Sequence, residues 1–174
     1  GVHRGWTRLP DVSADLDALA AHAVCTVCAG AKSILDLPAT VEALETRGVP
    51  IVGYGTTRFP RFYASGSDDL TLEVSVDDAA GCAEICRMQW ETLRLERGVL
   101  LVQDPPEAVA MDGDMLEREI DAAERAAEEG GVAGRERTPF VLASLAEVTE
   151  GKSLAANVAP VSYTHLTLPT TRLV

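Results

Sequence analysis

The chain has 174 residues, which is enough for one domain and marginal for two. Apolar residues make up 47% of it and charged residues 24%, a balance that supports a sizeable core and argues against intrinsic disorder. The 27 acidic residues outnumber the 15 basic ones and give a net charge of −12, which argues against nucleic acids and anionic membranes as partners. A small phosphorylated ligand stays compatible with this charge, because one or two cations and some backbone N–H groups suffice to bind it.

Targeting signals and disulfides are not apparent in the sequence. No apolar run approaches the roughly 20 residues that span a bilayer, and residues 1–5 carry neither a basic nor an apolar leader. Four cysteines are too few for a disulfide-stapled scaffold. We therefore expect a soluble protein of a reducing compartment, the cytoplasm.

Short apolar runs alternate with amphipathic segments along the chain. Helices are predicted over 14–22, between Pro38 and Gly48, behind Ser75, over 112–129 and from Pro139 to about Val148. Strands are predicted over 24–28, 50–54, 70–74 and 98–102. Strands and helices that alternate at this spacing predict an α/β fold, layered α/β/α around a largely parallel sheet.

For three of the helices the sequence also predicts caps, apolar stripes or an acidic face. Ser13 is expected to cap the first, and Ser75 with Asp78 resembles a capping box for the third. The apolar stripe of that third helix is Ala79, Cys82, Ala83, Cys86, Trp90 and Leu93. The helix over 112–129 turns Leu116, Ile120, Ala123 and Ala127 inward. Residues 104–129 hold ten acids and two arginines, which we interpret as a solvated face and not as a binding surface.

The four cysteines superficially offer a thiolate metal site. Cys25 and Cys28 lie three residues apart on a predicted strand, so they point to opposite faces and cannot share an ion without a turn. Cys82 and Cys86 lie on an apolar helical stripe, where cysteine acts as a small hydrophobe. We therefore expect core residues here. A thiolate metal or redox module is the alternative, and it predicts bound zinc that is lost on substituting Cys25 or Cys28.

Two groups of residues are candidates for chemistry. Lys32 follows a buried strand and three small residues, which places it at the carboxyl edge of the sheet, where α/β proteins bind ligands. A partly desolvated lysine can attack a carbonyl carbon there, although a surface loop lysine is the plainer interpretation. The second group is the cluster of His3, Arg4, Asp11, Ser13 and Asp15. In it, Asp11 and Asp15 bracket a helix start whose N–H groups can bind phosphate while a carboxylate holds a hard divalent cation. Helix capping by Ser13 and Asp15 explains the same pattern.

Longer blocks of the sequence resemble a known family. They include Asp-Val-Ser-Ala-Asp-Leu at 11–16 and Val-Cys-Ala-Gly-Ala-Lys-Ser-Ile-Leu-Asp at 27–36, with shorter blocks at 1–5, 44–50, 138–140 and 153–157. In order and spacing these blocks resemble pseudouridine-5′-phosphate glycosidases, also called pseudouridylate synthases, which are related to indigoidine synthase A-type proteins. The resemblance makes residues 1–160 the C-terminal part of a single glycosidase domain. Residues 161–174 look like translated adaptor sequence, and we expect a non-native tail there.

The resemblance implies an enzyme of nucleotide catabolism that interconverts pseudouridine 5′-phosphate and water with uracil and ribose 5-phosphate. It assigns the nucleophile, which forms an imine with the sugar, to Lys32. It assigns a divalent cation, manganese, to Asp11. Substrate contacts fall on Ser13, Ala14, Asp15 and Asn157. Members of the family form trimers, so further copies of the chain are the implied partners.

The general acid of the family is a glutamate upstream of the blocks present in this sequence. We therefore expect the 174-residue chain to be nearly inactive as a fragment, because it lacks the glutamate that protonates the departing uracil carbon in the family. The alternative function is a non-catalytic module that binds a sugar phosphate on the same fold.

Overall fold

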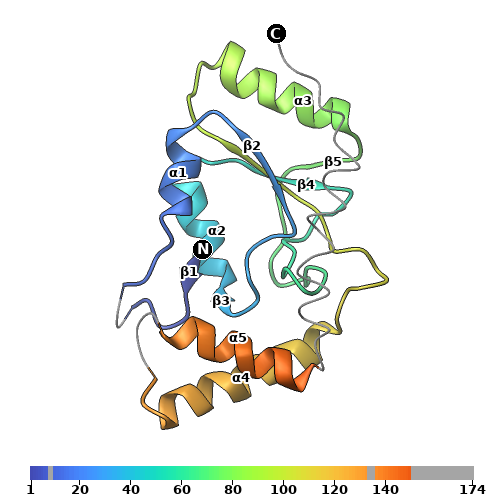
Figure 1. Ribbon diagram of the computed structural model, residues 1–174. Helices are drawn as coiled ribbons and strands as arrows, with labels where there is room; N and C mark the ends of the chain where they lie inside the picture. Colours follow the sequence, from blue (N-terminus) through green and yellow to red (C-terminus); the bar gives the residue numbers. More distant parts are fainter. Residues whose placement is uncertain (8–9, 133–135, 150–174) are drawn as a thin grey trace.

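The computed structural model describes residues 1–7, 10–132 and 136–149, and a parallel sheet lies at its centre (Figure 1). Its strands are, in spatial order, β2 (Cys25–Cys28), β6 (Val99–Val102), β4 (Ile51–Tyr54) and β5 (Ser75–Val76). All three pairings between these strands are parallel. A small antiparallel pair, β1 (Val2–His3) with β3 (Leu35–Asp36), lies apart from the sheet. The predicted α/β architecture with a parallel sheet is confirmed.

The helices are α1 (Asp15–Ala21), α2 (Leu37–Thr46), α3 (Ala79–Arg87), α4 (Gly113–Glu129) and α5 (Arg137–Val148), and α3 continues into a π-helical turn, η1 (Met88–Thr92). Three helices, α1, α2 and α3, pack against the sheet, whereas α4 and α5 pack on each other away from it (Figure 1). In β6, Val99 and Leu101 pack against α3 on one face. Leu100 and Val102 pack on the other face with residues of α1 and α2. A strand buried on both faces is what the continuous apolar run predicted.

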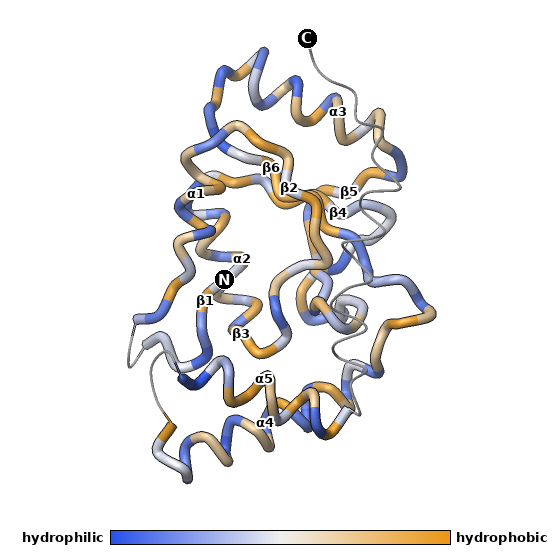
Figure 2. The backbone as a smooth tube through the Cα atoms, in the orientation of Figure 1, coloured by the Kyte–Doolittle hydropathy of each residue, from blue (hydrophilic) through white to orange (hydrophobic). Residues whose placement is uncertain are grey.

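The distribution of hydropathy along the chain follows these layers (Figure 2). Apolar residues concentrate in β4 and β6, whereas polar and apolar residues alternate along α4. Within the described ranges, no helix has the length and hydropathy needed to cross a membrane.

The strand predicted over 70–74 is wrong, and strand β5 begins only at Ser75. The amide of Leu72 donates to the carbonyl of Thr57, so this segment pairs with the loop after β4 before it reaches the sheet. The capping prediction shifts with it, because Ser75 lies in β5 and Asp78 caps α3 by accepting from the amide of Gly81 (2.8 Å). The apolar content of residues 70–74 does not show whether they pair with the loop after β4 or with β4 itself.

Two further expectations about helices need correction. Leu93 was predicted on the apolar stripe of α3, but it is 56% exposed. The π-helical turn before it is wider than an α-helical turn and rotates the following residues out of phase. At α1 the cap position is taken by Ala14, although the hydroxyl of Ser13 still accepts from the amide of Asp15 (3.3 Å).

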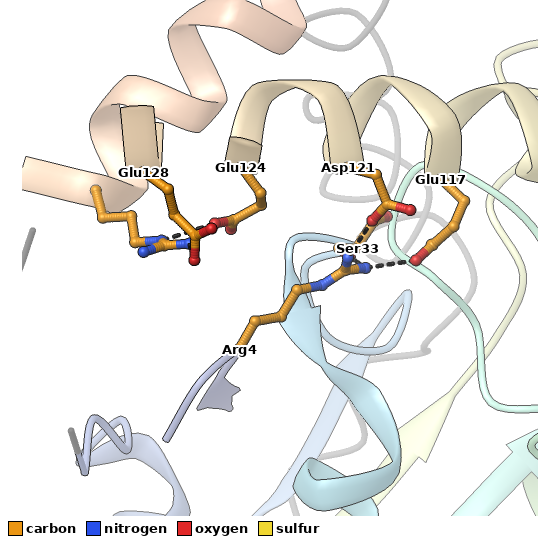
Figure 3. A network of polar contacts seen from close by, with 7 residues as sticks. Arg4, Ser33, Glu117, Asp121, Glu124 and Glu128 are labelled. Atoms are coloured by element: carbon orange, nitrogen blue, oxygen red, sulfur yellow. Dashed lines mark hydrogen bonds and ion pairs between the residues drawn. The ribbon is translucent and has the colours of Figure 1, made fainter. Parts of the chain in front are cut away.

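Helix α4 buries its predicted stripe, but its acidic face is not simply solvated. The buried residues are Leu116, Ile120, Ala123 and Ala127. On the polar side, Arg4 binds Glu117 (2.7 Å) and Asp121 (2.9 Å) (Figure 3). Arg137 binds Glu124 (2.7 Å) and Glu128 (3.4 Å). Four of the acids therefore hold α4 to the first residues of the chain and to α5.

Candidate functional site

The chain leaves β2 through a tightly held loop that carries Lys32. Gly30 adopts a left-handed conformation (φ +81°) and forms an isolated antiparallel bridge with Arg61. The amide of Phe62 donates to the carbonyl of Ala29 (2.9 Å) on the same two segments. A β-carbon on Gly30 would overlap the carbonyl of Pro60, so only glycine fits this approach. The side chain of Lys32 is exposed at the end of this fixed backbone.

The residue after Lys32 holds the other side of the loop. Ser33 is 2% exposed, and its hydroxyl donates to the carbonyl of Arg61. Its own carbonyl accepts from the guanidinium of Arg4 (3.2 Å), which also carries the two ion pairs to α4 (Figure 3). Arg4 therefore connects the Lys32 loop with α4.

Substitution of Arg4 tests this connection. Arg4→Gln is expected to lower the free energy of unfolding by about 1–2 kcal/mol, because it removes two exposed ion pairs and a hydrogen bond to a buried residue. Urea unfolding measures the change. Arg47→Gln is the control, because Arg47 forms one exposed pair with Asp17 (2.7 Å) and a hydrogen bond to the carbonyl of Ala43 (3.0 Å), both away from the loop, and should lose only about 0.5–1 kcal/mol. Equal losses in the two variants would contradict a special role for Arg4.

A cavity of about 600 Å³ lies beside the loop, lined by residues of α1, α2 and β2. Thr26 and Cys28 line it from one face of β2, as expected for alternate residues of a strand, and Val24, just before β2, lines it too. The polar side chains on its wall include Lys32, Ser13, Asp15, His3, Thr40 and Thr138. Three residues that the sequence predicted, Ser13, Asp15 and Lys32, therefore face one space.

Charged side chains of the predicted site affect the pKa of the Gly1 amino group. Burial lowers the pKa of the Gly1 amino group, whereas the negative charge of Asp15 opposes this effect. The charges of Lys32 and Asp11 act on the same group. Gly1, Asp15 and Lys32 all line the cavity.

The other predicted site residues do not line the cavity or lie outside the described residues. Asp11 does not line the cavity, and its carboxylate lies 3.7 Å from Nδ1 of His3. Ala14 occupies the cap position of α1 and does not line the cavity either. Asn157 lies outside the described residues, as do residues 161–174.

Sequence reasoning missed four polar residues that line the cavity, namely His22, Thr26, Thr40 and Thr138, whereas His3 belonged to the predicted cluster. His3 meets the hydroxyl of Thr138 through Nδ1 (3.3 Å), and the two lie in separate family blocks. Thr40 is 2% exposed, accepts from the amide of Val2 (2.9 Å) and donates to the carbonyl of Asp36 (2.7 Å). The position of Thr138 within a family block was the available signal, whereas nothing in the sequence distinguished Thr40, Thr26 or His22.

Few side chains that could hold a metal ion come close together in the described ranges. Among residues 1–7, 10–132 and 136–149, three or more candidate ligands come within reach of one ion only at Cys25, Cys82 and Cys86. Asp11 instead offers one carboxylate that is 48% exposed, beside an imidazole. A single exposed carboxylate fits a hard divalent cation that keeps most of its waters.

The structure first defines the class of the protein, an α/β protein with a cavity beside the carboxyl end of a parallel strand, where proteins of this class bind ligands. Residues 1–166 match the family described as indigoidine synthase A like protein. The chain belongs to the indigoidine synthase A-like family. The match extends past residue 160 into the segment predicted to be a non-native tail.

Curated relatives agree with this family. The chain is 46% identical over 158 residues to a protein named pseudouridine-5′-phosphate glycosidase from Glaesserella parasuis serovar 5, covering 91% of this chain and 52% of the relative. It is 48% identical over 161 residues to a protein of the same name from Chloroflexus aurantiacus, with 91% and 52% covered. The predicted resemblance is confirmed, and the chain spans about half the length of these relatives.

Solved structures share the fold. The prealnumycin C-glycosynthase AlnA, in complex with ribulose 5-phosphate, superposes with a TM-score of 0.88 at 30% identity, covering 96% of this chain and 55% of that one. An indigoidine synthase A-like protein from Thermotoga maritima superposes with a TM-score of 0.81 at 33% identity, covering 96% and 53%.

Proposed function

We propose that this chain supplies the nucleophile and substrate-contact portion of a pseudouridine-5′-phosphate glycosidase. The observation that carries the proposal is that Lys32, Ser13 and Asp15 line one cavity in a chain 46% identical to proteins of that name. The reaction converts pseudouridine 5′-phosphate and water reversibly to uracil and ribose 5-phosphate. A structural neighbour that holds ribulose 5-phosphate supports a sugar phosphate as the ligand.

Lys32 is proposed to break the carbon–carbon bond through an imine. Its amine attacks C1′ and displaces the ring oxygen, which opens the ribose and takes up a proton. As C1′ releases C5 of uracil, the nitrogen lone pair forms the C=N bond and a carboxylic acid protonates C5. Water then hydrolyses the imine, which releases ribose 5-phosphate and restores the lysine. The family resemblance places the acid upstream of the blocks in this chain, so we expect little turnover from the 174 residues alone.

The other residues of the cavity are proposed to hold the substrate. Ser13 and Asp15 can hydrogen-bond sugar hydroxyls, and Thr138 with His3 extends the polar wall. Asn157 is proposed as a further contact by family resemblance. Asp11 would hold a hard divalent cation, for which manganese is the proposed identity. When bound, such a cation orders water and polarises phosphate oxygens.

Reductive trapping tests the proposal on the 174-residue chain itself. Imine formation with ribose 5-phosphate does not require the acid that protonates C5 of uracil. The chain is incubated with ribose 5-phosphate and cyanoborohydride, and modified peptides are mapped by mass spectrometry. Its amines are few, namely Lys32, Lys152 and the amino group of Gly1. We expect the adduct on Lys32, and competition by pseudouridine 5′-phosphate.

The outcomes separate the two candidate functions. Labelling only at Lys152 or Gly1 would contradict the proposed nucleophile. Binding of ribose 5-phosphate without any adduct would indicate the non-catalytic sugar-phosphate module, which the bound ribulose 5-phosphate of the structural neighbour also favours. Assembly into trimers and a cytoplasmic location stay predictions.

A further inference from the structure

Three cysteine side chains meet between strand β2 and helix α3. The Sγ atoms of Cys25, Cys82 and Cys86 all lie within 4.8 Å of one another, and those of Cys25 and Cys82 are 3.9 Å apart. Four ligands placed tetrahedrally at the Zn–S distance of about 2.3 Å stand about 3.8 Å from one another. The three sulfur atoms therefore already have nearly the spacing of a thiolate metal site.

Two regular elements hold the three cysteines in place. Residues of β2 alternate between faces, so Cys25 and Val27 point towards α3. Cys82 and Cys86 are four residues apart on α3, which places both on its sheet-facing side. Cys28 points to the opposite face of β2 and lines the cavity. The prediction that Cys25 and Cys28 point to opposite faces is thus confirmed. The contact of Cys25 with the cysteines of α3 was not predicted from the sequence.

Apolar packing explains only part of this arrangement. Cys82 and Cys86 are 6% and 8% exposed and belong to the core beneath α3, where cysteine serves as a small hydrophobe. Cys25 is exposed, so burial does not account for its position beside them. The exposed position of Cys25 places this end of the cluster at the surface, where an ion can reach the two buried cysteines.

We propose that Cys25, Cys82 and Cys86 bind one thiophilic metal ion, Zn²⁺ or Cu(I), which joins the edge strand β2 to α3. Binding replaces the thiol protons by metal–sulfur bonds and releases them to solvent, with no change of oxidation state. Thiolates select these soft ions over hard cations such as Mn²⁺. This site therefore does not compete with Asp11 for the same metal.

The test is a metal titration of the untagged, reduced chain. Zn²⁺, Cu(I) and Mn²⁺ are added separately, and stoichiometry is measured after removal of free metal. Co²⁺ serves as a spectroscopic probe, because thiolate-to-cobalt absorption reports sulfur ligands directly. We expect one equivalent of Zn²⁺ or Cu(I), no Mn²⁺ at this site, proton release and a higher melting temperature. The ion that binds more tightly identifies the occupant.

Matched serine variants locate the site. Even outer-shell partners of a metal are worth about 10- to 100-fold in affinity, so Cys25→Ser, which removes a direct ligand at an exposed position, should weaken binding at least that much. Cys28→Ser, on the same strand but the opposite face, should leave affinity unchanged. The proposal is overturned if the reduced wild-type chain binds neither ion, or if Cys28→Ser loses as much affinity as Cys25→Ser. A wild-type chain that forms a Cys25–Cys82 disulfide and binds no metal when reduced also overturns it.

Discussion

Lys32→Ala is expected to abolish the ribose 5-phosphate adduct completely, because it removes the side-chain amine on the wall of the cavity. The loss should exceed 100-fold, since covalent catalysis depends on the nucleophile itself and Lys32 is the one lysine within residues 1–7, 10–132 and 136–149. Lys152 is the single other lysine of the chain. Peptide mapping after reduction measures the effect, and Lys152→Arg is the control that should label normally.

Lys32→Arg separates the nucleophile from its charge. A guanidinium keeps the positive charge beside the cavity but does not form an imine under these conditions. We expect ribose 5-phosphate to bind this variant within about threefold of the wild-type affinity, because Coulomb attraction near solvent is weak and is largely retained. No adduct should form. If the adduct persists in either variant, Lys32 is not the nucleophile.

Gly30→Ala is expected to lower the free energy of unfolding by about 2–5 kcal/mol. The left-handed backbone (φ +81°) costs an L-residue about 1–2 kcal/mol. The new β-carbon also overlaps the carbonyl of Pro60, and overpacking of this kind costs about 1–3 kcal/mol. The bridge between Gly30 and Arg61 prevents the two segments from separating freely, so the strain should also displace Lys32 and slow adduct formation.

Gly55→Ala is the matched control for this prediction. Gly55 is also left-handed (φ +62°), but no atom lies within 4 Å of the position of its β-carbon. This variant should lose only the conformational cost of about 1–2 kcal/mol and should form the adduct at the wild-type rate. Urea unfolding and trapping kinetics measure both effects. Equal losses in the two variants would mean that the contact with Pro60 carries no energy.

Corrections to the predicted fold concern segments whose partners are distant in sequence. Residues 70–74 have the composition of a strand, yet they pair with the loop after β4 before β5 begins. Leu93 fits the period of an α-helix, but the π-helical turn changes that period. Both results depend on backbone hydrogen bonds that residue type alone does not specify.

Motif spacing and local periodicity in the sequence determined the family, the α/β class, the inward stripe of α4 and the place of Lys32 after a strand of the parallel sheet. The prediction that this strand is buried on both faces is wrong, because β2 lies at the edge of the sheet. These properties are local, because apolar period and turn residues act over one or two turns of chain. Tertiary structure alone decided which residues share the cavity, which arginine holds the acids of α4, and that Cys25 meets Cys82. Arg4 and Asp121 are 117 residues apart and the two cysteines are 57 apart, so only the packed layers bring them together.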